Sequence, residues 1–318
     1  MSVVCSPLTL NFNTMITINN LDFSYKNVAV FKNISLEFKE GNVYGLLGEN
    51  GVGKTTLLKI ISGLQFPKNG TCVVDDFIPS ERNPYFLQNI FYLPEEVITE
   101  DTTPEKFINK LGVFYPRYDH SYFLNLMKEL EVDANKKFNA MSYGQKKKSL
   151  LACALSLRTD YLLLDEPTNG LDIPSKALFR KVILQHGNST DHTDLHVSDY
   201  GQNNTSDTRD TWSYNPTIII STHQVKDVEN LIDPIVILEH DEVLLNSTFE
   251  EISQRLYFEY GAEKSDEALY SEMMPGGYIN VLPNTFNMES KVNVEALFNA
   301  VRCNKKKIRE IFALGCEL

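Results

Sequence analysis

The chain has 318 residues, of which 42% are hydrophobic and 23% are charged, and its formal net charge is -12. This composition is typical of a globular protein and excludes a disordered or fibrous chain. The excess of acidic residues argues against broad binding to nucleic acid or anionic lipid, since both need basic charge. No apolar run approaches the ~20 residues that span a bilayer, so a membrane role would require a partner chain.

Five cysteines are scattered without C-x-x-C spacing, and an odd number provides no complete disulfide framework. We therefore expect reduced thiols, with Cys72 and Cys153 in the core. Residues 1–14 show no periodicity and lack the basic start and apolar centre of a secretory signal. They are predicted to form a disordered leader on a protein that stays inside the cell.

Residues 15–38 alternate between apolar and polar side chains around a turn at 22–27. This pattern predicts antiparallel hairpins of short strands. Phe23 or Tyr25 could stack on a nucleotide base, although an aromatic residue in a strand more often serves packing alone. Both interpretations stay open at this point.

The segment Gly48–Thr56 has the form G-x-x-x-x-G-K-[ST] of a phosphate-binding loop. A short apolar run at 43–47 predicts a strand before it, and apolar residues at helical spacing over 55–64 predict a helix after it. Glycines let backbone amides approach phosphate oxygens, Lys54 can reach the β and γ phosphates, and the Thr55 hydroxyl suits Mg²⁺. The alternative is a glycine-rich turn that merely starts a helix.

The region after this helix supplies further strands and a helical insertion. Strands are predicted at 71–74 and at 90–93, and Glu95 follows the second of them. Residues 107–127 have a helical pattern that is interrupted near Pro116. This insertion carries no obvious chemistry.

Ser142 and Gln145 have the spacing of a helix capping box, ahead of an apolar helix that runs to Leu157. Three lysines, 146–148, occupy the first turn, where the helix dipole favours acidic groups instead. A helix start this positive is better explained by a nearby anion or acidic partner. The alternative is a well-capped helix with no further role.

An apolar strand at 161–164 ends in Asp165 and Glu166. Such a continuous apolar run is typical of a parallel strand buried on both faces, and ligands of open α/β sheets lie at the carboxyl ends of the strands. Asp165 is then a candidate to hold Mg²⁺, and Glu166 to polarise an attacking water. The alternative is a solvated Asp-Glu pair at an ordinary strand end.

Residues 217–222 predict one more buried strand, and His223 at its tip could contact a γ-phosphate or be merely structural.

Residues 187–215 are rich in Ser, Thr, Asn, Asp and Gly, which predicts a flexible insertion. A final strand pair at 235–245 closes the first domain. In the tail, 254–318, one strand and two helices are predicted.

Five ordered motifs together resemble the ATP-binding cassette of ABC transporters over about residues 15–253. They are similar to Walker A at Gly48–Thr55, the signature motif L-S-G-G-Q at Ser142–Gln145, Walker B at 162–166, the D-loop at 169–172 and the switch histidine at His223. The expected fold is α/β, with a P-loop NTPase core, a mostly parallel sheet, N-terminal antiparallel strands, a helical insertion and a small C-terminal α+β extension. Some exporter-type cassettes carry such an extension, which could be regulatory, dimerising or a packing appendage.

The resemblance implies an ATPase that uses ATP and Mg²⁺ and powers a separate membrane permease chain from the cytoplasmic face of the cell membrane. It implies a head-to-tail dimer with a second copy or a paralogous cassette, in which Ser142 and Gly144 cap the γ-phosphate of the opposite subunit. It also implies that Tyr25 is the base-stacking aromatic.

The predicted site residues fall into three groups. Catalysis is assigned to Lys54, Glu166 and His223. ATP binding is assigned to Tyr25, Gly48, Asn50, Gly51, Gly53, Lys54, Thr55, Thr56, Ser142, Gly144 and Gln145. Mg²⁺ binding is assigned to Thr55, Asp165 and Glu95.

Two positions depart from the family pattern. Tyr143 replaces the first glycine of the signature motif and adds bulk where the nucleotide is approached, but activity should persist because Ser142 and Gly144 remain. Glu95 stands where the family has the Q-loop glutamine, and its carboxylate can still reach Mg²⁺ or water.

Two other functions are considered. A soluble ABC ATPase that remodels a ribosomal or nucleoprotein complex usually has two cassettes or long coiled coils, and the charge of -12 also disfavours it. A P-loop kinase or GTPase would not need the segment Ser142–Gln145, and no guanine-recognition motif N-K-x-D follows a later strand.

Overall fold

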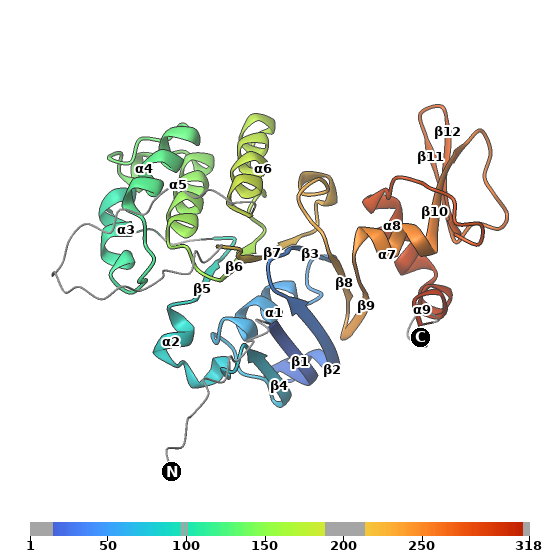
Figure 1. Ribbon diagram of the computed structural model, residues 1–318, viewed down its shortest axis with the longest axis horizontal. Coiled ribbons are helices and arrows are strands. Elements are labelled where there is room, and N and C mark those ends of the chain that lie inside the picture. Colours follow the sequence, from blue (N-terminus) through green and yellow to red (C-terminus); the bar gives the residue numbers. More distant parts are fainter. Residues whose placement is uncertain (1–14, 97–98, 100, 188–213, 314–318) are drawn as a thin grey trace, which may run out of the picture.

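In the described residues, three sheets form the framework of the protein (Figure 1). The computed structural model describes residues 15–96, 99, 101–187 and 214–313. The predicted leader, 1–14, lies outside the described residues, as do residues 188–213 of the predicted insertion.

The N-terminal sheet is antiparallel, with its strands in the order β2-β1-β4. Its strands are β1 (Met15–Tyr25), β2 (Val28–Lys39) and β4 (Asn69–Val74). The alternating pattern of β1 directs Ile16 and Ile18 into the core, where both are fully buried. The prediction of antiparallel strands ahead of the phosphate loop is confirmed.

The central sheet has six strands in the order β5-β6-β7-β3-β8-β9. Neighbouring strands are parallel from β5 to β8, and β9 runs antiparallel to β8. The strands are β3 (Val43–Leu47), β5 (Ile90–Leu93), β6 (Tyr161–Asp165), β7 (Thr217–Thr222), β8 (Ile235–Glu239) and β9 (Glu242–Ser247). This arrangement confirms the predicted mostly parallel sheet.

Helices lie on both sides of the central sheet (Figure 1). Those before residue 249 are α1 (Lys54–Ile61), α2 (Pro84–Leu87), α3 (Pro104–Gly112), α4 (His120–Glu129), α5 (Tyr143–Ser156) and α6 (Ile173–Gly187). The described residues also form 3₁₀ turns between these elements: η1 (Pro79–Glu81), η2 (Phe138–Ala140) and η3 (Val225–Asp227). The predicted helical insertion is α3 and α4, which are separated around Pro116 as expected. In the described part of the chain, every helix is too short or too polar to cross a membrane.

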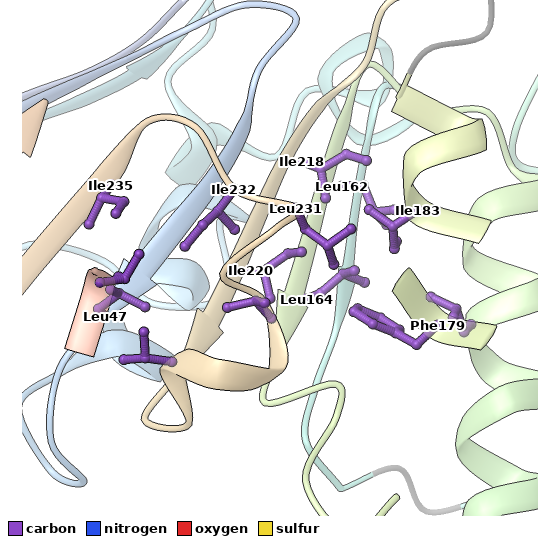
Figure 2. Close-up of a cluster of buried hydrophobic side chains, with 14 of the residues drawn as sticks. Leu47, Leu162, Leu164, Phe179, Ile183, Ile218, Ile220, Leu231, Ile232 and Ile235 are labelled. Carbon is purple, nitrogen blue, oxygen red and sulfur yellow. The ribbon is translucent and has the colours of Figure 1, made fainter. Parts of the chain in front are cut away.

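Successive side chains of the central strands enter two different cores, because they point to opposite faces of the sheet. Leu163 of β6 and Ile219 of β7 pack with α1 and the N-terminal sheet. Leu164 and Ile220 belong to the other core, where Figure 2 shows Leu164 beside Phe179 of α6. Burial on both faces explains why these strands read as uninterrupted apolar runs.

Both ends of the predicted flexible insertion, 187–215, belong to packed structure. Gly187 is the last residue of α6. The hydroxyl of Tyr214 donates to the main-chain oxygen of Thr159 at 3.1 Å and lies 3.0 Å from Nε2 of His186, which is 2% exposed. The predicted boundaries are therefore too wide, and only 188–213 stay outside the described fold.

The C-terminal extension is an α+β unit that packs on the rest of the chain. It consists of α7 (Phe249–Arg255), β10 (Leu256–Gly261), β11 (Tyr270–Met274), β12 (Gly277–Pro283), α8 (Val294–Cys303) and α9 (Lys305–Ala313). Buried residues of this unit, among them Phe258 and Leu297, belong to the same apolar cluster as Leu164. The extension therefore shares a continuous core with the central sheet.

Candidate active site

Three adjacent strands bring the predicted site residues to one edge of the central sheet. In the strand order β6-β7-β3, Asp165 is the register partner of Ser221, and Thr222 is the partner of Leu47. Parallel strands end at the same edge, which is where ligands of open α/β sheets bind. The segments after β3, β6 and β7 therefore meet although they are far apart in sequence.

The phosphate-binding loop joins β3 to α1. Its last glycine, Gly53, is the N-cap of α1 with φ +108°, and a Cβ there would lie 2.6 Å from Cζ of Phe31. Lys54 is 6% exposed, and its Nζ donates to the main-chain oxygens of Gly48 at 2.7 Å and Glu49 at 3.1 Å. The first turn of α1 contains no acidic residue. The loop is thus a helix N-terminus with a buried cation, which suits a phosphate.

Glu166 lies beside Lys54 and His223. Its Oε1 is 3.4 Å from Nζ of Lys54 and 2.9 Å from Nδ1 of His223. Its Oε2 is buried and has no hydrogen-bond partner among the described residues. Burial lowers the pKa of Lys54, and the neighbouring charge of Glu166 opposes this shift. A buried acceptor without a donor needs one from outside the chain, and water can be that donor.

Asp165 is held as a hydrogen-bond acceptor by two hydroxyl groups. Ser221 Oγ donates to its Oδ1 at 2.5 Å, and the hydroxyl of Tyr92 donates to its Oδ2 at 3.0 Å. Burial and the charge of Asp165 raise the pKa of Tyr92. The sequence analysis missed both hydroxyl donors, although Tyr92 lies in the strand next to β6 and could have been found from the strand order.

The residues present fit a Mg²⁺ ion that is shared with phosphate. Asp165 is 2% exposed and offers hard oxygen ligands, and the hydroxyl of Thr55 stands in the first turn of α1. Over the described residues, no group of three or more His, Cys, Asp or Glu side chains could hold a metal by itself. Mg²⁺ is commonly held by one or two protein ligands, with phosphate and water completing its shell.

Of the two aromatic candidates, Tyr25 is 42% exposed and Phe23 is buried at 5%. The rings meet edge to face with centroids 4.9 Å apart, and Thr56 Oγ1 donates to the Tyr25 hydroxyl at 3.3 Å. Tyr25 therefore lies beside the first turn of α1 with an accessible ring. Asn50 and Gly51 form the exposed tip of the loop.

The segment Ser142–Gln145 forms the start of α5. Gln145 N donates to Ser142 Oγ at 3.2 Å and Ser142 N donates to Gln145 Oε1 at 3.2 Å, so the predicted capping box is confirmed. Ser142 is exposed and Gly144 is half-buried. In the described structure, no hydrogen bond or ion pair connects these residues to the phosphate-binding loop of the same chain.

Lys147 has a partner that the sequence analysis did not predict. Its Nζ donates to the main-chain oxygens of Glu166 at 2.8 Å and Asn169 at 2.9 Å, and burial lowers its pKa. The Tyr143 ring lies against Gly170, where an added Cβ would be 2.6 Å from Cε1 of the ring. The Tyr143 ring therefore contacts the turn 169–172 of its own chain, and its residue is 49% exposed. That it also adds bulk where the nucleotide is approached stays a prediction.

Glu95 follows β5 and reaches the same turn. Its Oε1 accepts a hydrogen bond from Nδ2 of Asn169 at 2.6 Å. The carboxylate thus connects the end of β5 to the turn after Glu166. Its assignment to Mg²⁺ stays a prediction.

Comparison with known proteins identifies the family of this chain. A sequence model described as ABC transporter matches residues 31–169. The ABC transporter ATP-binding protein YtrB of Bacillus subtilis is 31% identical over 230 residues, covering 72% of this chain and 70% of that protein. The chain belongs to the ABC transporter family. It is an ATP-binding subunit of this family, and its activity is ATP hydrolysis.

Two further matches support the ABC assignment. The ATP-binding protein NatA of Bacillus subtilis is 28% identical over 257 residues, covering 77% of this chain and 89% of that protein. A solved ATP-binding subunit of an ABC transporter superposes with a TM-score of 0.61 at 22% identity, covering 75% of this chain and 92% of that one, and shows the ABC ATPase fold. None of these matches supports the alternative of a ribosome-remodelling or nucleoprotein-remodelling ATPase.

Proposed function

We propose that this ABC ATPase hydrolyses P–O bonds of ATP·Mg²⁺ with Glu166 as the group that orients and polarises water. The observation that carries the proposal is the buried Oε2 of Glu166, which has no donor among the described residues while Oε1 is occupied by Lys54 and His223. One carboxylate oxygen is thus anchored and the other is left for a water molecule.

Phosphate binding, orientation of Glu166 and Mg²⁺ binding are assigned to different residues of the chain. Lys54 and the amides at the start of α1 bind and orient the phosphates. His223 bonds to Glu166 and fixes the direction of its carboxylate. Asp165, held by Ser221 and Tyr92, would ligate Mg²⁺ together with Thr55. When bound, Mg²⁺ neutralises negative charge on the phosphates.

Two subunits are proposed to pair head to tail, with Ser142 and Gly144 of one chain facing the phosphate-binding loop of the other. The exposure of Ser142 and the lack of a link to the loop in the described chain support this arrangement. The capped start of α5 presents free amides, which favours a phosphate from outside the chain.

A mixing experiment tests the shared site. Lys54→Ala and Ser142→Arg chains are each expected to be inactive, but a mixed dimer contains one site with both an intact loop and an intact signature motif. An equal mixture should recover about one quarter of wild-type ATPase activity if sites are shared and independent. No recovery in a mixture that forms dimers would contradict the head-to-tail arrangement.

The role of Glu166 is tested separately. Glu166→Gln should bind ATP, form a dimer that persists in size-exclusion chromatography, and lose at least about a hundredfold of its turnover, since general base catalysis contributes on that order. Asp160→Asn, at an exposed ion pair with Arg117, is the matched control and should hydrolyse normally. Unchanged hydrolysis by Glu166→Gln would rule out this residue as the base.

The membrane component is proposed to be a separate permease chain, which would hold this subunit at the cytoplasmic face of the membrane. The relatives YtrB and NatA are both ATP-binding proteins of ABC transporters, which supports this assignment. Copurification in detergent should recover a membrane protein. Recovery of RNA without a membrane protein would favour the remodelling alternative.

A further inference from the structure

A helix of the C-terminal extension reaches the phosphate-binding loop. Nη1 of Arg302, in the last turn of α8, lies 2.7 Å from Oε1 of Glu49. Glu49 is the second residue of the loop, and its main-chain oxygen accepts a hydrogen bond from Lys54 at 3.1 Å. One loop residue therefore connects the extension to the lysine that is proposed to bind phosphate.

The guanidinium of Arg302 is held in place from several sides. Its Nε lies 3.5 Å from Oε1 of Glu239, at the end of β8, and its Cζ lies 5.3 Å from the centroid of the Phe298 ring. The Arg302 side chain is 28% exposed and that of Glu239 is 15% exposed. Lys305 adds a second ion pair to Glu239 at 2.6 Å. Such a branched, partly buried network restrains the guanidinium more than an isolated surface pair would.

The Glu49 carboxylate places negative charge on a loop that must bind a polyanion. Its side chain is 54% exposed, so it is not needed for packing, and Arg302 is the cation that offsets it. Without this cation, the Glu49 carboxylate would repel the phosphates. The main-chain oxygen of Glu49 could also move away from Lys54, because Arg302 would no longer restrain this residue. The effect should be confined to nucleotide binding, since Arg302 contacts neither Glu166 nor His223.

We propose that Arg302 is a positioning residue for the phosphate-binding loop, through which the C-terminal extension sets the affinity for ATP. This inference rests on the proposed binding of ATP phosphates by Lys54 and its loop. It gives the extension a role in the reaction, beyond that of a packing appendage.

A double-mutant cycle tests the inference in the full-length chain. Arg302→Gln should raise the Kd and KM for ATP roughly three- to tenfold with kcat unchanged, a range typical of one lost contact in a network. In a Glu49→Gln background, the same substitution should change the Kd by less than about twofold, because no uncompensated carboxylate remains. Thermal unfolding of each variant is recorded in parallel.

Arg309→Gln is the matched control, because Arg309 of α9 pairs with Glu242 of β9 and, among the described residues, has no ion pair with the loop. It should leave the Kd for ATP unchanged. The inference would be overturned if Arg302→Gln raised the Kd equally with and without Glu49, or did not raise it at all. A similar rise in Kd for Arg309→Gln would also overturn it. Lys54→Ala separates the role of Arg302 from the proposed binding of ATP phosphates by Lys54. If Lys54→Ala retains wild-type affinity for ATP, the proposed phosphate site is wrong.

Discussion

Lys54 and Glu166 form a buried ion pair, with Nζ 3.4 Å from Oε1 and side chains that are 6% and 7% exposed. Removal of one partner from a buried pair leaves an uncompensated charge, which is more costly than removal of both. This relationship joins the phosphate-binding loop to the proposed base within one chain.

Lys54→Met is therefore expected to lower the free energy of unfolding by about 3 kcal/mol, because Glu166 would be left buried with only His223 beside it. The double variant Lys54→Met/Glu166→Gln should recover most of this loss. Urea denaturation at neutral pH measures both values. Equal stability of the single and double variants would show that the pair is not electrostatically coupled.

Lys147→Met should lower kcat about tenfold with little change in the KM for ATP. Lys147 donates hydrogen bonds to the main-chain oxygens of Glu166 and Asn169. Loss of these bonds would displace the proposed base, and a small displacement of a catalytic group slows the reaction. Lys148→Met is the control, since in the described structure Lys148 donates no hydrogen bond to Glu166 or Asn169. Steady-state ATPase assays separate kcat from KM. A larger KM with unchanged kcat would assign Lys147 to nucleotide binding instead.

Gly53→Ala should prevent ATP binding and lower the free energy of unfolding by at least ~2 kcal/mol, because φ is +108° and a Cβ would meet Phe31 at 2.6 Å. Gly51→Ala is the control: φ is +86°, but no atom lies within 4 Å of the added Cβ. The backbone cost at Gly51 should be only about 1 kcal/mol. Urea denaturation should therefore give a lower free energy of unfolding for Gly53→Ala than for Gly51→Ala.

His186 predicts a pH dependence of stability. It is enclosed by the hydroxyls of Tyr122, 3.1 Å from Nδ1, and Tyr214, 3.0 Å from Nε2. Burial, together with the charge of Arg158, lowers its pKa from 6.5 to about 3. Below pH 6.5 the unfolded chain takes up a proton that the folded chain does not, so this residue's contribution is complete above pH 6.5 and is lost as the pH falls toward 3.

The loss from His186 should be about 1.4 kcal/mol per pH unit within this window. The unfolding free energy of wild-type protein should therefore fall more steeply between pH 6.5 and 5 than that of His186→Gln, by about 2 kcal/mol over the interval. Urea denaturation at each pH provides the comparison. Parallel profiles would show that the imidazole does not titrate differently in the folded chain.

Local chemistry was sufficient to predict many elements of the fold. The Gly48–Thr56 loop needs glycines and a lysine at fixed spacing, the capping box at Ser142 and Gln145 lies within one turn, and the apolar run before Asp165 indicates a buried parallel strand. The prediction of one strand in the tail was wrong, since β10 and β11 were both missed. Tyr270–Met274 of edge strand β11 is half-exposed and shows no alternation of apolar and polar side chains.

The phosphate-binding loop, the carboxylate pair and the family could be predicted from the sequence, because each motif consists of residues that are close together in the chain. Which groups meet across long separations depends on the tertiary structure. The strand order β6-β7-β3 brings Ser221 to Asp165 and His223 to Glu166, and packing of the extension brings Arg302 to Glu49. Such contacts depend on how whole elements pack, and no local pattern of residues encodes them.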